Sequence, residues 1–407
     1  MSQDGEAQSG TVGEVFTAFL KLGLTAFGGP VAHIGYFRTE FVDRRRWLDD
    51  AAFADLVALC QFLPGPASSQ LGLGLGARRA GPLGAAAAWA AFTLPSALLM
   101  ILAAWGVIAI GGDSPTAGAT LHGLKLVAVA VVAQAVRQMA ISLAPDRPRA
   151  SILVAAAALA ILLPGVQGQL AAIVCGALAG LAFCRATAVA APSGPVSLRV
   201  PLPLALAMLV LFAILLTLPA VIVVPEGLRM INAAYRAGSL VFGGGHVVLP
   251  LLEVETVRTG LIGADTFLAG YGLAQAVPGP LFTFVAFLGT AADTAADGVL
   301  KGVFGGTMAL LAIFVPAVLL LFGISPFWDR LRSWPTARAA LTGINAAVVG
   351  LLAAALYDPV ITAAIQGPTD IPAALAAYVL LAVWKAPPWL VVLGFGAFGA
   401  MLGAASL

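Results

Sequence analysis

Gln61-Phe-Leu-Pro-Gly-Pro66 and Gln275-Ala-Val-Pro-Gly-Pro280 are two short stretches that interrupt apolar segments with a glycine between two prolines. Proline removes a backbone donor and ends a helix, so each stretch separates two helical arms. The arms are 51–63 and 67–77 around the first stretch, and 265–277 and 281–292 around the second. Each arm is shorter than the ~20 residues that a helix needs to cross the ~30 Å hydrocarbon core of a bilayer. We therefore predict two re-entrant hairpins with tips near the middle of the membrane; a single kinked transmembrane helix is the alternative.

The composition indicates an integral membrane protein. Of 407 residues, 60% are hydrophobic and only 10% are charged, whereas soluble domains carry about 25% charged residues. The 46 Gly and 26 Pro fit membrane helices, in which both residues are frequent. A net charge of +2 lacks the basic excess of a nucleic-acid-binding protein. We predict an all-α polytopic protein that lies in the lipid bilayer and has no nucleic-acid partner.

The two Pro-Gly-Pro stretches belong to a tandem duplication. A second motif, Lys21-Leu-Gly-Leu-Thr-Ala-Phe-Gly-Gly29, recurs as Arg236-Ala-Gly-Ser-Leu-Val-Phe-Gly-Gly244 at nearly the same offset along the chain. Pro95 in a long apolar segment matches Pro316 in the same order. Self-similarity of this kind marks a repeat architecture. The predicted organisation is a polar N-terminal tail 1–10, a first repeat 11–195, a linker with an extra transmembrane helix 196–225, and a second repeat 226–407.

The charge pattern predicts that the second repeat is inverted relative to the first. Lys and Arg stay on the cytoplasmic side of membrane proteins. The loop after the first Phe-Gly-Gly motif carries Arg38, Arg44, Arg45 and Arg46, whereas its counterpart carries Glu253, Glu255 and Asp265 beside Arg258. One extra span between the copies turns the second copy over, so the N-terminus is predicted in the cytoplasm and the C-terminus in the periplasm. Full spans are predicted at 83–110, 117–143, 150–166, 168–185, 202–224, 302–323, 337–357, 371–384 and 387–405.

The Pro-Gly-Pro breaks are candidate anion-binding elements. Irregular backbone at membrane depth is tolerated only where it is buried in protein or lines a wet cavity. The helix that follows each break offers free N–H groups and a positive dipole end to an anion. Ser68, Ser69 and Thr283 add hydroxyl donors there, and Gln61 and Gln275 align just before the breaks. The candidate tip residues themselves are Pro64, Gly65, Pro66, Pro278, Gly279 and Pro280.

The Phe-Gly-Gly motifs form a second break in each repeat. Glycine pairs let the backbone approach a ligand closely, and they serve helix packing equally well. The residues concerned are Phe27, Gly28 and Gly29 in the first copy, and Phe242, Gly243 and Gly244 in the second. Lys21 and Arg236 stand at the same position before them. A cation inside an apolar segment costs ~2.5–3.5 kcal/mol on insertion scales, so we interpret this pair as partners of an anionic ligand, with snorkelling to the interface as the alternative.

Other polar residues are weaker candidates for coupling or gating. Glu40 and Glu255 align in loops on opposite faces and are either gate carboxylates or, as we prefer from the sequence, solvated loop charges. His33 and His246 follow the Phe-Gly-Gly motifs without aligning, and Lys125 lies on an apolar helix. The three histidines are too scattered for a metal site, and no Walker A or HExxH pattern is present. We therefore expect no metal, no cofactor and no enzymatic activity.

The motifs resemble those of the chromate ion transporter family in its long, two-repeat form. The segments that carry the resemblance are Phe-Gly-Gly-Pro-Val-Ala-His33, Phe-Leu-Pro-Gly-Pro66, Phe-Gly-Gly-Gly-His-Val-Val248 and Ala-Val-Pro-Gly-Pro280. The resemblance implies a bacterial inner-membrane protein that exports chromate on the proton motive force and gives chromate resistance, with sulfate as a competing dianion. It ties the Phe-Gly-Gly and Pro-Gly-Pro segments to function.

Two transport mechanisms fit these observations. The first is an alternating-access exporter of a tetrahedral oxyanion, in which the two tips cradle the dianion. A negative-inside potential contributes ~2.3 kcal/mol per charge per 100 mV to outward movement of an anion. The second is a passive or sulfate-selective anion pathway on the same scaffold. The sequence is compatible with a homodimer and leaves the preferred oxyanion and the coupled ion open.

Overall fold

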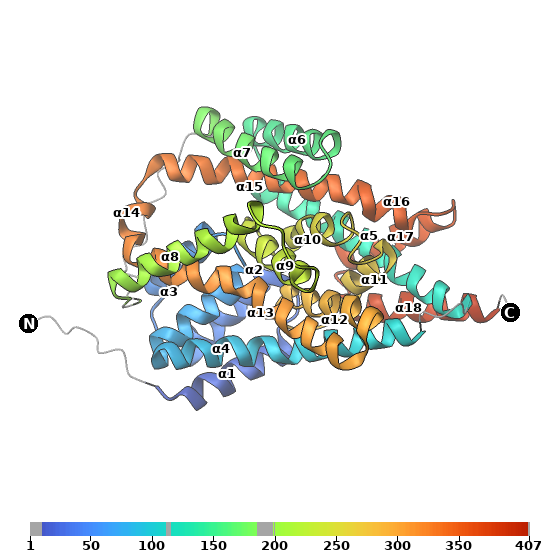
Figure 1. The fold of residues 1–407 in the computed structure, drawn as a ribbon, viewed down its shortest axis with the longest axis horizontal. Helices are drawn as coiled ribbons and strands as arrows, with labels where there is room; N and C mark the ends of the chain where they lie inside the picture. Colours follow the sequence, from blue (N-terminus) through green and yellow to red (C-terminus); the bar gives the residue numbers. More distant parts are fainter. Residues whose placement is uncertain (1–9, 111–114, 185–197, 199, 406–407) are drawn as a thin grey trace, which may run out of the picture.

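The computed structural model describes residues 10–110, 115–184, 198 and 200–405. Every regular element in these ranges is a helix, which confirms the predicted all-α class (Figure 1). Five helices are long and apolar enough to cross a membrane: Ala67–Ala109, Thr116–Leu143, Val166–Phe183, Val299–Arg332 and Pro335–Ala364. The predicted tail 1–10, apart from Gly10, and the predicted end of the first repeat at 185–195 lie outside the described ranges.

The first repeat opens with a helical hairpin that has the Phe-Gly-Gly motif at its tip. Helix α1 (Val12–Thr25) runs to the motif, and α2 (Gly29–Arg38) with a short π-helix (Thr39–Arg44) runs back. The indole Nε1 of Trp47 donates to Glu14 Oε1 at 3.1 Å, which joins the start of α1 to the segment after the π-helix. Gly28 turns the chain with φ +101°, a conformation that only glycine adopts without strain. The motif, expected only as a break, is therefore a second hairpin tip.

The Pro-Gly-Pro stretch is the tip of the next hairpin. Helix α3 (Asp50–Phe62) leads into it and α4 (Ala67–Ile110) leaves it. Leu56 of α3 packs on Gly74 of α4, so the two arms lie side by side rather than forming one kinked helix. Helix α4 is itself broken at Gly81, which has φ +65°, and Gly76 before the break packs against Gly84 after it. The part of α4 before Gly81 is thus the second arm of the hairpin and runs back from its tip, and residues 82–110 form the long span.

The second repeat has the same order of elements. Helices α9 (Arg229–Leu240) and α10 (Val248–Thr256) flank its Phe-Gly-Gly motif, and α11 (Ala264–Ala274) and α12 (Phe284–Asp297) flank its Pro-Gly-Pro stretch. The turn at Gly298 leads into the long helix α13 (Val299–Ile324). Gly289 of α12 packs against Gly305 of α13, as Gly76 packs against Gly84 in the first repeat.

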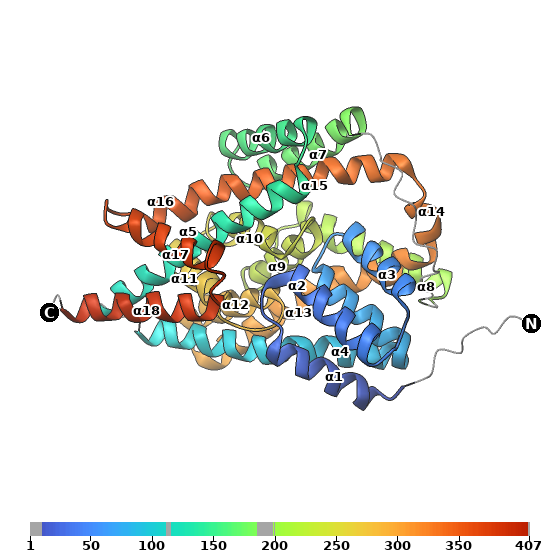
Figure 2. The same cartoon turned by 180° about the vertical axis from the view of Figure 1, so that it is seen from behind.

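The remaining helices surround these hairpins. They are α5 (Pro115–Leu143), α6 (Arg147–Leu162), α7 (Val166–Phe183), α8 (Leu202–Thr217), α14 (Trp328–Arg332), α15 (Pro335–Ala355), η7 (Leu356–Ile361), α16 (Thr362–Ala364), α17 (Asp370–Ala382) and α18 (Pro388–Ala405). Helices α6 and α7 cover α15 at one edge of the molecule, and α1 and α4 lie at the opposite edge (Figures 1 and 2). Gly180 of α7 meets Gly343 of α15 at close range, because small residues let membrane helices approach each other.

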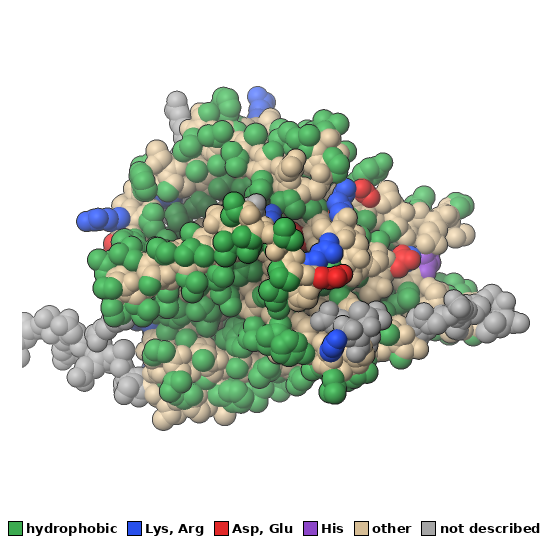
Figure 3. All heavy atoms as spheres, viewed as in Figure 1, with side chains coloured by type: hydrophobic (Ala, Val, Ile, Leu, Met, Phe, Trp, Pro, Cys, Tyr) green, Lys and Arg blue, Asp and Glu red, His purple; other side chains and the backbone are tan. Residues whose placement is uncertain are grey.

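The exterior matches a lipid environment. Figure 3 shows hydrophobic side chains over most of one face, with charged side chains confined to small groups. Helix α8 exposes Leu204, Leu206, Val210, Leu211 and Ile214. Apolar surface of this extent is unusual for a soluble monomer. Helix α1 begins at one end of the long axis and α18 ends at the other (Figures 1 and 2).

Candidate anion-binding site

The four hairpin tips meet in the interior through two reciprocal hydrogen bonds. The amide of Gly65 donates to the carbonyl oxygen of Val241 at 2.7 Å, and the amide of Gly279 donates to that of Ala26 at 2.9 Å. Val241 and Ala26 directly precede the two Phe-Gly-Gly motifs. Each Pro-Gly-Pro tip is therefore bonded to the Phe-Gly-Gly tip of the other half, and the two glycine amides are not free for a ligand.

A proline-containing helix of the opposite half packs behind each Pro-Gly-Pro tip. A side chain at Gly279 would lie 2.9 Å from Ser96 Oγ and 3.2 Å from the carbonyl oxygen of Phe92, both on α4. A side chain at Gly65 would lie 3.5 Å from Ala317 on α13. Gly65 and Gly279 also have φ of +118° and +99°. Glycine is required at both tips by the backbone conformation, and at Gly279 by the lack of space as well.

The first Pro-Gly-Pro tip carries unsatisfied polar groups. Ser69 is 2% exposed, and its hydroxyl has no hydrogen-bond partner among the described residues; the same holds for Oε1 of the buried Gln70. The amide nitrogen of Gln70 donates to Pro64 O at 3.0 Å, which orients that side chain. A buried polar atom without a partner costs ~1–3 kcal/mol. Together with the free N–H groups of the first turn of α4, the Ser69 hydroxyl makes this tip suited to an anion.

His33 determines which serine is free to bind a ligand. Its Nε2 lies 3.3 Å from the carbonyl oxygen of Ala26, and its Nδ1 lies 3.3 Å from Ser68 Oγ. A carbonyl oxygen only accepts, so Nε2 of the neutral ring carries the proton and Nδ1 accepts from the Ser68 hydroxyl. Ser68 therefore donates to His33, and Ser69 keeps the unused donor.

The second histidine also lies at the tips. His246 Nδ1 pairs with the hydroxyl of Tyr271 at 2.8 Å. Its Nε2 is the nearest atom to the position that a side chain at Gly29 would take, at 3.9 Å. His246 thus faces the Phe-Gly-Gly tip of the first half, although the two histidines do not align in sequence. No group of three or more metal-ligating side chains occurs in the part of the chain that the structure describes.

The second Pro-Gly-Pro tip is built differently. The chain leaves it as a 3₁₀ turn, η5 (Leu281–Thr283), before α12 begins. The hydroxyl of Thr283 donates to Pro280 O at 2.8 Å and is not available as a ligand donor. Gln275 has a buried amide nitrogen without a partner among the described residues, whereas Gln61 is exposed. The candidate site is therefore asymmetric, with its hydroxyl donor in the first half.

The aligned cations and the aligned carboxylates pair with each other. Lys21 Nζ lies 3.6 Å from Glu40 Oε2, and Arg236 Nε lies 2.9 Å from Glu255 Oε1. Our preferred interpretation of Glu40 and Glu255 as solvated loop charges is wrong: Glu40 is only 5% exposed and Glu255 is partly buried. In each repeat the helix after the Phe-Gly-Gly motif folds back, so its end lies beside the helix before the motif. The assignment of Glu40 and Glu255 to loops did not include this contact. In this conformation both cations are balanced within the protein.

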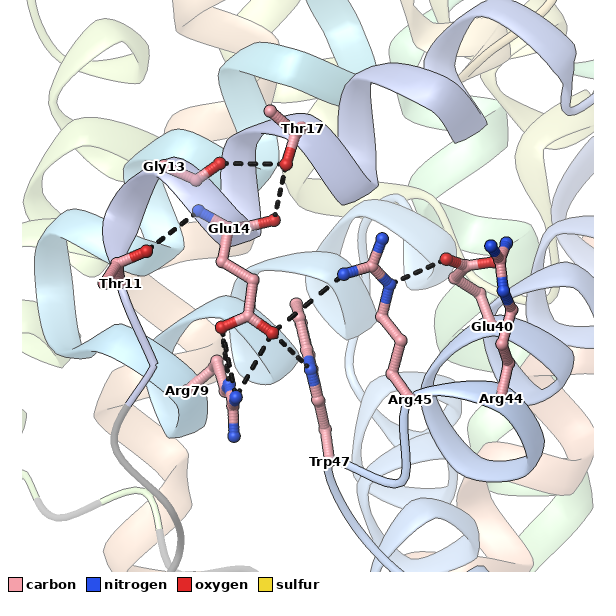
Figure 4. A network of polar contacts seen from close by, with 9 residues as sticks. All are labelled: Thr11, Gly13, Glu14, Thr17, Glu40, Arg44, Arg45, Trp47 and Arg79. Carbon is pink, nitrogen blue, oxygen red and sulfur yellow. Dashed lines mark hydrogen bonds and ion pairs between the residues drawn. The ribbon is translucent and has the colours of Figure 1, made fainter.

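Glu40 belongs to a charged network at the base of the first two hairpins (Figure 4). It accepts from Arg45 Nε at 2.7 Å and from Arg44 Nη1 at 3.1 Å, while Arg79 Nη2 lies 3.0 Å from Glu14 Oε2. Burial disfavours the Glu40 carboxylate, but the hydrogen bond from Arg45 and the nearby cations outweigh it and hold the pKa of Glu40 below its usual value. Glu40 is therefore ionised at neutral pH, and its network carries more positive than negative charge.

Two further ion pairs join the halves away from the tips. Lys125 Nζ on α5 contacts Asp265 Oδ1 at the start of α11 at 2.8 Å. The fully buried Asp55 on α3 accepts from Trp328 Nε1 at 3.0 Å and from Arg332 Nη1 at 3.2 Å. Lys125 therefore does not reach the tips. Asp55 was not predicted as a functional residue, although a single acid inside an apolar arm is itself a signal.

Broken helices from two halves meet inside a bundle that contains five helices long and apolar enough to cross a membrane, which defines a multi-pass membrane protein with discontinuous helices at its centre. The family profile described as chromate transporter matches residues 13–181 and 228–400, so the chain belongs to the chromate transporter family. A chromate transport protein of Pseudomonas aeruginosa is 30% identical over 358 residues, covering 85% of this chain and 80% of the relative. One of Cupriavidus metallidurans is 27% identical over 377 residues, covering 92% and 88%. No solved structure matches the chain.

Proposed function

We propose that this protein is a secondary active exporter of chromate, or of a similar tetrahedral oxyanion such as sulfate, in a bacterial inner membrane. The halves 11–195 and 226–407 act as inverted repeats, with the N-terminus in the cytoplasm and the C-terminus in the periplasm. The proton motive force or the membrane potential drives export, which lowers cellular chromate and gives resistance. Family membership and the names of the two bacterial relatives support chromate as the substrate.

The observation that carries this proposal is the unsatisfied first turn of α4 at the meeting point of the tips. The Ser69 hydroxyl is buried and unpartnered, and the helix start is positive without carrying a titratable charge. Such a site holds a dianion while leaving it free to depart, because no arginine or lysine binds it directly. Lys21 and Arg236 are paired with Glu40 and Glu255, so in this conformation they do not bind the anion directly.

The reciprocal tip contacts support alternating access around a fixed centre. Each half touches the other there through one backbone hydrogen bond, Gly65 to Val241 and Gly279 to Ala26. A rocking motion of the halves about this point exposes the site to either side in turn, as in other inverted-repeat transporters. The ion pairs Asp55–Arg332 and Lys125–Asp265 join the two halves, and such a motion has to rearrange them together with the helix packing between the halves.

The test is chromate flux in proteoliposomes that contain the purified protein. Ser69→Ala removes the unused hydroxyl, and because hydrogen bonds to charged groups contribute ~1.5–3 kcal/mol, the concentration for half-maximal flux rises roughly 10- to 100-fold. The matched control is Ser142→Ala, whose hydroxyl only bonds back to Met139 O. Accumulation against a gradient excludes a passive pathway. Unchanged affinity in Ser69→Ala contradicts the assigned site, and an absence of flux in the wild type contradicts the proposed function.

A further inference from the structure

A second polar site lies at the base of the hairpin formed by α9 and α10, away from the tips. A cavity of about 280 Å³ opens between the end of α10, the turn from α6 to α7, and the end of α15 with η7. Its polar lining consists of Gln169, Glu253, Arg258, Tyr357 and Asp358. By the charge pattern of the sequence, this end of the molecule faces the periplasm.

Glu253 is the buried carboxylate of this cavity. It is 4% exposed and lies in the last turn of α10, which is not one of the helices long enough to span the membrane. Arg258 Nε lies 3.2 Å from its Oε1 and 3.4 Å from its Oε2. The same guanidinium reaches Asp358 Oδ2 through Nη2 at 3.2 Å. One cation is therefore shared between two carboxylates, and the cluster has a net charge of −1 when both are ionised.

Other groups around α10 do not supply the missing positive charge. The elements packed on α10 include α7, α9, α15 and η4. Several of their polar groups are already engaged: Gln169 donates to Pro250 O, Arg236 pairs with Glu255, Arg229 reaches Thr259 O, and His246 pairs with Tyr271. Asn345 on α15 has a buried Oδ1 without a partner among the described residues, but its amide carries no charge. Tyr357 is neutral. A proton is the smallest cation that balances this cluster, and the cavity gives it a route to solvent.

We propose that Glu253 is a proton-binding site on the periplasmic side of this protein. The Glu253 carboxylate takes up one proton from the periplasm and becomes a carboxylic acid, after which Arg258 keeps Asp358 as its one ionised partner. This change weakens the contact between Glu253 of α10 and Arg258, while Arg258 stays bound to Asp358 of η7. Since α10 leads to the Phe-Gly-Gly tip that holds Gly65 through Val241, the proton acts on the hairpin at the substrate site. The inference rests on the proposed transport function and names the proton-loading group for it.

The local electrostatics support this assignment. Burial raises the pKa of Glu253 to about 7; the charge and hydrogen bond of Arg258 oppose this shift and the charge of Asp358 adds to it. A group with this pKa changes its charge within the physiological range. The site is not repeated at the aligned position in the first half, which is Arg38, an exposed residue paired with Asp43 and Asp50. A proton would therefore load on the second half, at Glu253.

The test measures chromate flux in proteoliposomes while the pH on the periplasmic face varies between about 5 and 9. In the wild type, chromate flux should depend on pH with a midpoint near 7. In Glu253→Gln, flux should continue but should no longer change with pH around that value. Asp358→Asn should move the midpoint to lower pH and Arg258→Gln to higher pH, because they remove a negative and a positive neighbour. The matched control is Glu226→Gln. Glu226 is an exposed carboxylate at the start of the second half, and the charge pattern of the sequence places it on the same side of the membrane as Glu253.

A second measurement is independent of transport. Infrared difference spectra of the purified protein should show a carboxylic acid C=O band that titrates near neutral pH in the wild type and in Glu226→Gln, and that is absent from Glu253→Gln. If the band and the pH response both persist in Glu253→Gln while flux is normal, the inference is overturned and the transport function stands. If neither the wild type nor any of the variants transports chromate at any pH, the proposed function fails, and the coupling role assigned to Glu253 fails with it.

Discussion

The amide of Gly65 is hydrogen-bonded to the carbonyl oxygen of Val241 at 2.7 Å, across the boundary between the two halves of the chain. The equivalent bond joins Gly279 to Ala26 at 2.9 Å. Backbone groups at a helix break must find partners inside a membrane protein, and here each half supplies the partner for the other. The contact explains why two different glycine motifs occur in each repeat: one provides the donor and the other exposes the acceptor.

Gly279→Ala should destabilise the protein and abolish transport. The backbone at Gly279 has φ +99°, and an added Cβ would lie 2.9 Å from Ser96 Oγ and 3.2 Å from Phe92 O. The left-handed conformation alone costs a non-glycine residue roughly 1–2 kcal/mol. Thermal unfolding in detergent measures the loss. The control is Gly227→Ala, where no atom lies within 4 Å of the added Cβ and φ is not positive; equal melting temperatures for the two variants would contradict the required glycine.

The Arg236–Glu255 pair should show strong coupling in a double-mutant cycle. Arg236 and Glu255 are partly buried and 2.9 Å apart, so Glu255→Gln leaves a cation without its counter-charge. We expect a loss of about 1–3 kcal/mol in unfolding free energy, the range for leaving a buried polar group without its partner. Combining it with Arg236→Gln should recover much of that loss. Additive effects of the two substitutions would mean that the pair contributes nothing.

Substitution in the Lys21–Glu40 pair should change the stability less than substitution in the Arg236–Glu255 pair, because the Lys21 side chain is 54% exposed. Exposed pairs contribute ~0–1 kcal/mol. Lys21→Gln should therefore change stability by less than Glu255→Gln does. A larger effect at Lys21 would show that its role is not set by burial.

Glu40 should make the protein sensitive to acid. The cations around it hold its pKa below the usual value. A carboxyl group with a lowered pKa in the folded state contributes stability above its unfolded pKa of about 4.3, and that contribution disappears as the pH falls through the folded value. Melting temperatures measured from about pH 7 to 3 should fall less steeply for Glu40→Gln than for the wild type. The exposed Asp43→Asn variant is the control, and identical slopes for the wild type and Glu40→Gln would contradict the prediction.

Cysteine labelling should reveal the asymmetry of the two Pro-Gly-Pro tips. In a variant without Cys60, Cys175 and Cys184, Ser69→Cys should react with a water-soluble thiol reagent and be protected by chromate, because an anion site must be reached by water. Thr283→Cys should be protected less by chromate, since Thr283 is as buried as Ser69 but its hydroxyl is bonded within its own turn. Equal protection by chromate at both positions would indicate a symmetric site.

The helical elements that depend only on neighbouring residues could be predicted from the sequence. Two prolines around a glycine end a helix wherever they occur, so the arms on each side of Pro64–Pro66 were predictable, and so was the all-α class. The Phe-Gly-Gly turn was not, because a glycine pair permits a hairpin without requiring one. The direction taken at Gly28 depends on packing between α1 and the segment that follows, which the sequence does not display.

The site was predicted in part. Ser69 was placed correctly at a helix start, but its difference from Ser68 depends on His33, which contacts Ser68 only in three dimensions. Thr283 was chosen for its hydroxyl, yet that hydroxyl bonds to the preceding turn. Glu40 aligns with Glu255 and Lys21 aligns with Arg236, so each repeat carries one carboxylate and one cation at matching positions. This recurrence was a signal of ion pairs that the sequence-based prediction did not use.

The exchanged tip contacts make each repeat an incomplete unit. A gene divided within the linker would produce two polypeptides, each with a donor glycine amide whose acceptor carbonyl lies on the other polypeptide. Neither fragment would then be stable by itself, whereas the two produced together would co-purify as a working complex. The tandem arrangement thus guarantees a one-to-one supply of two mutually dependent halves.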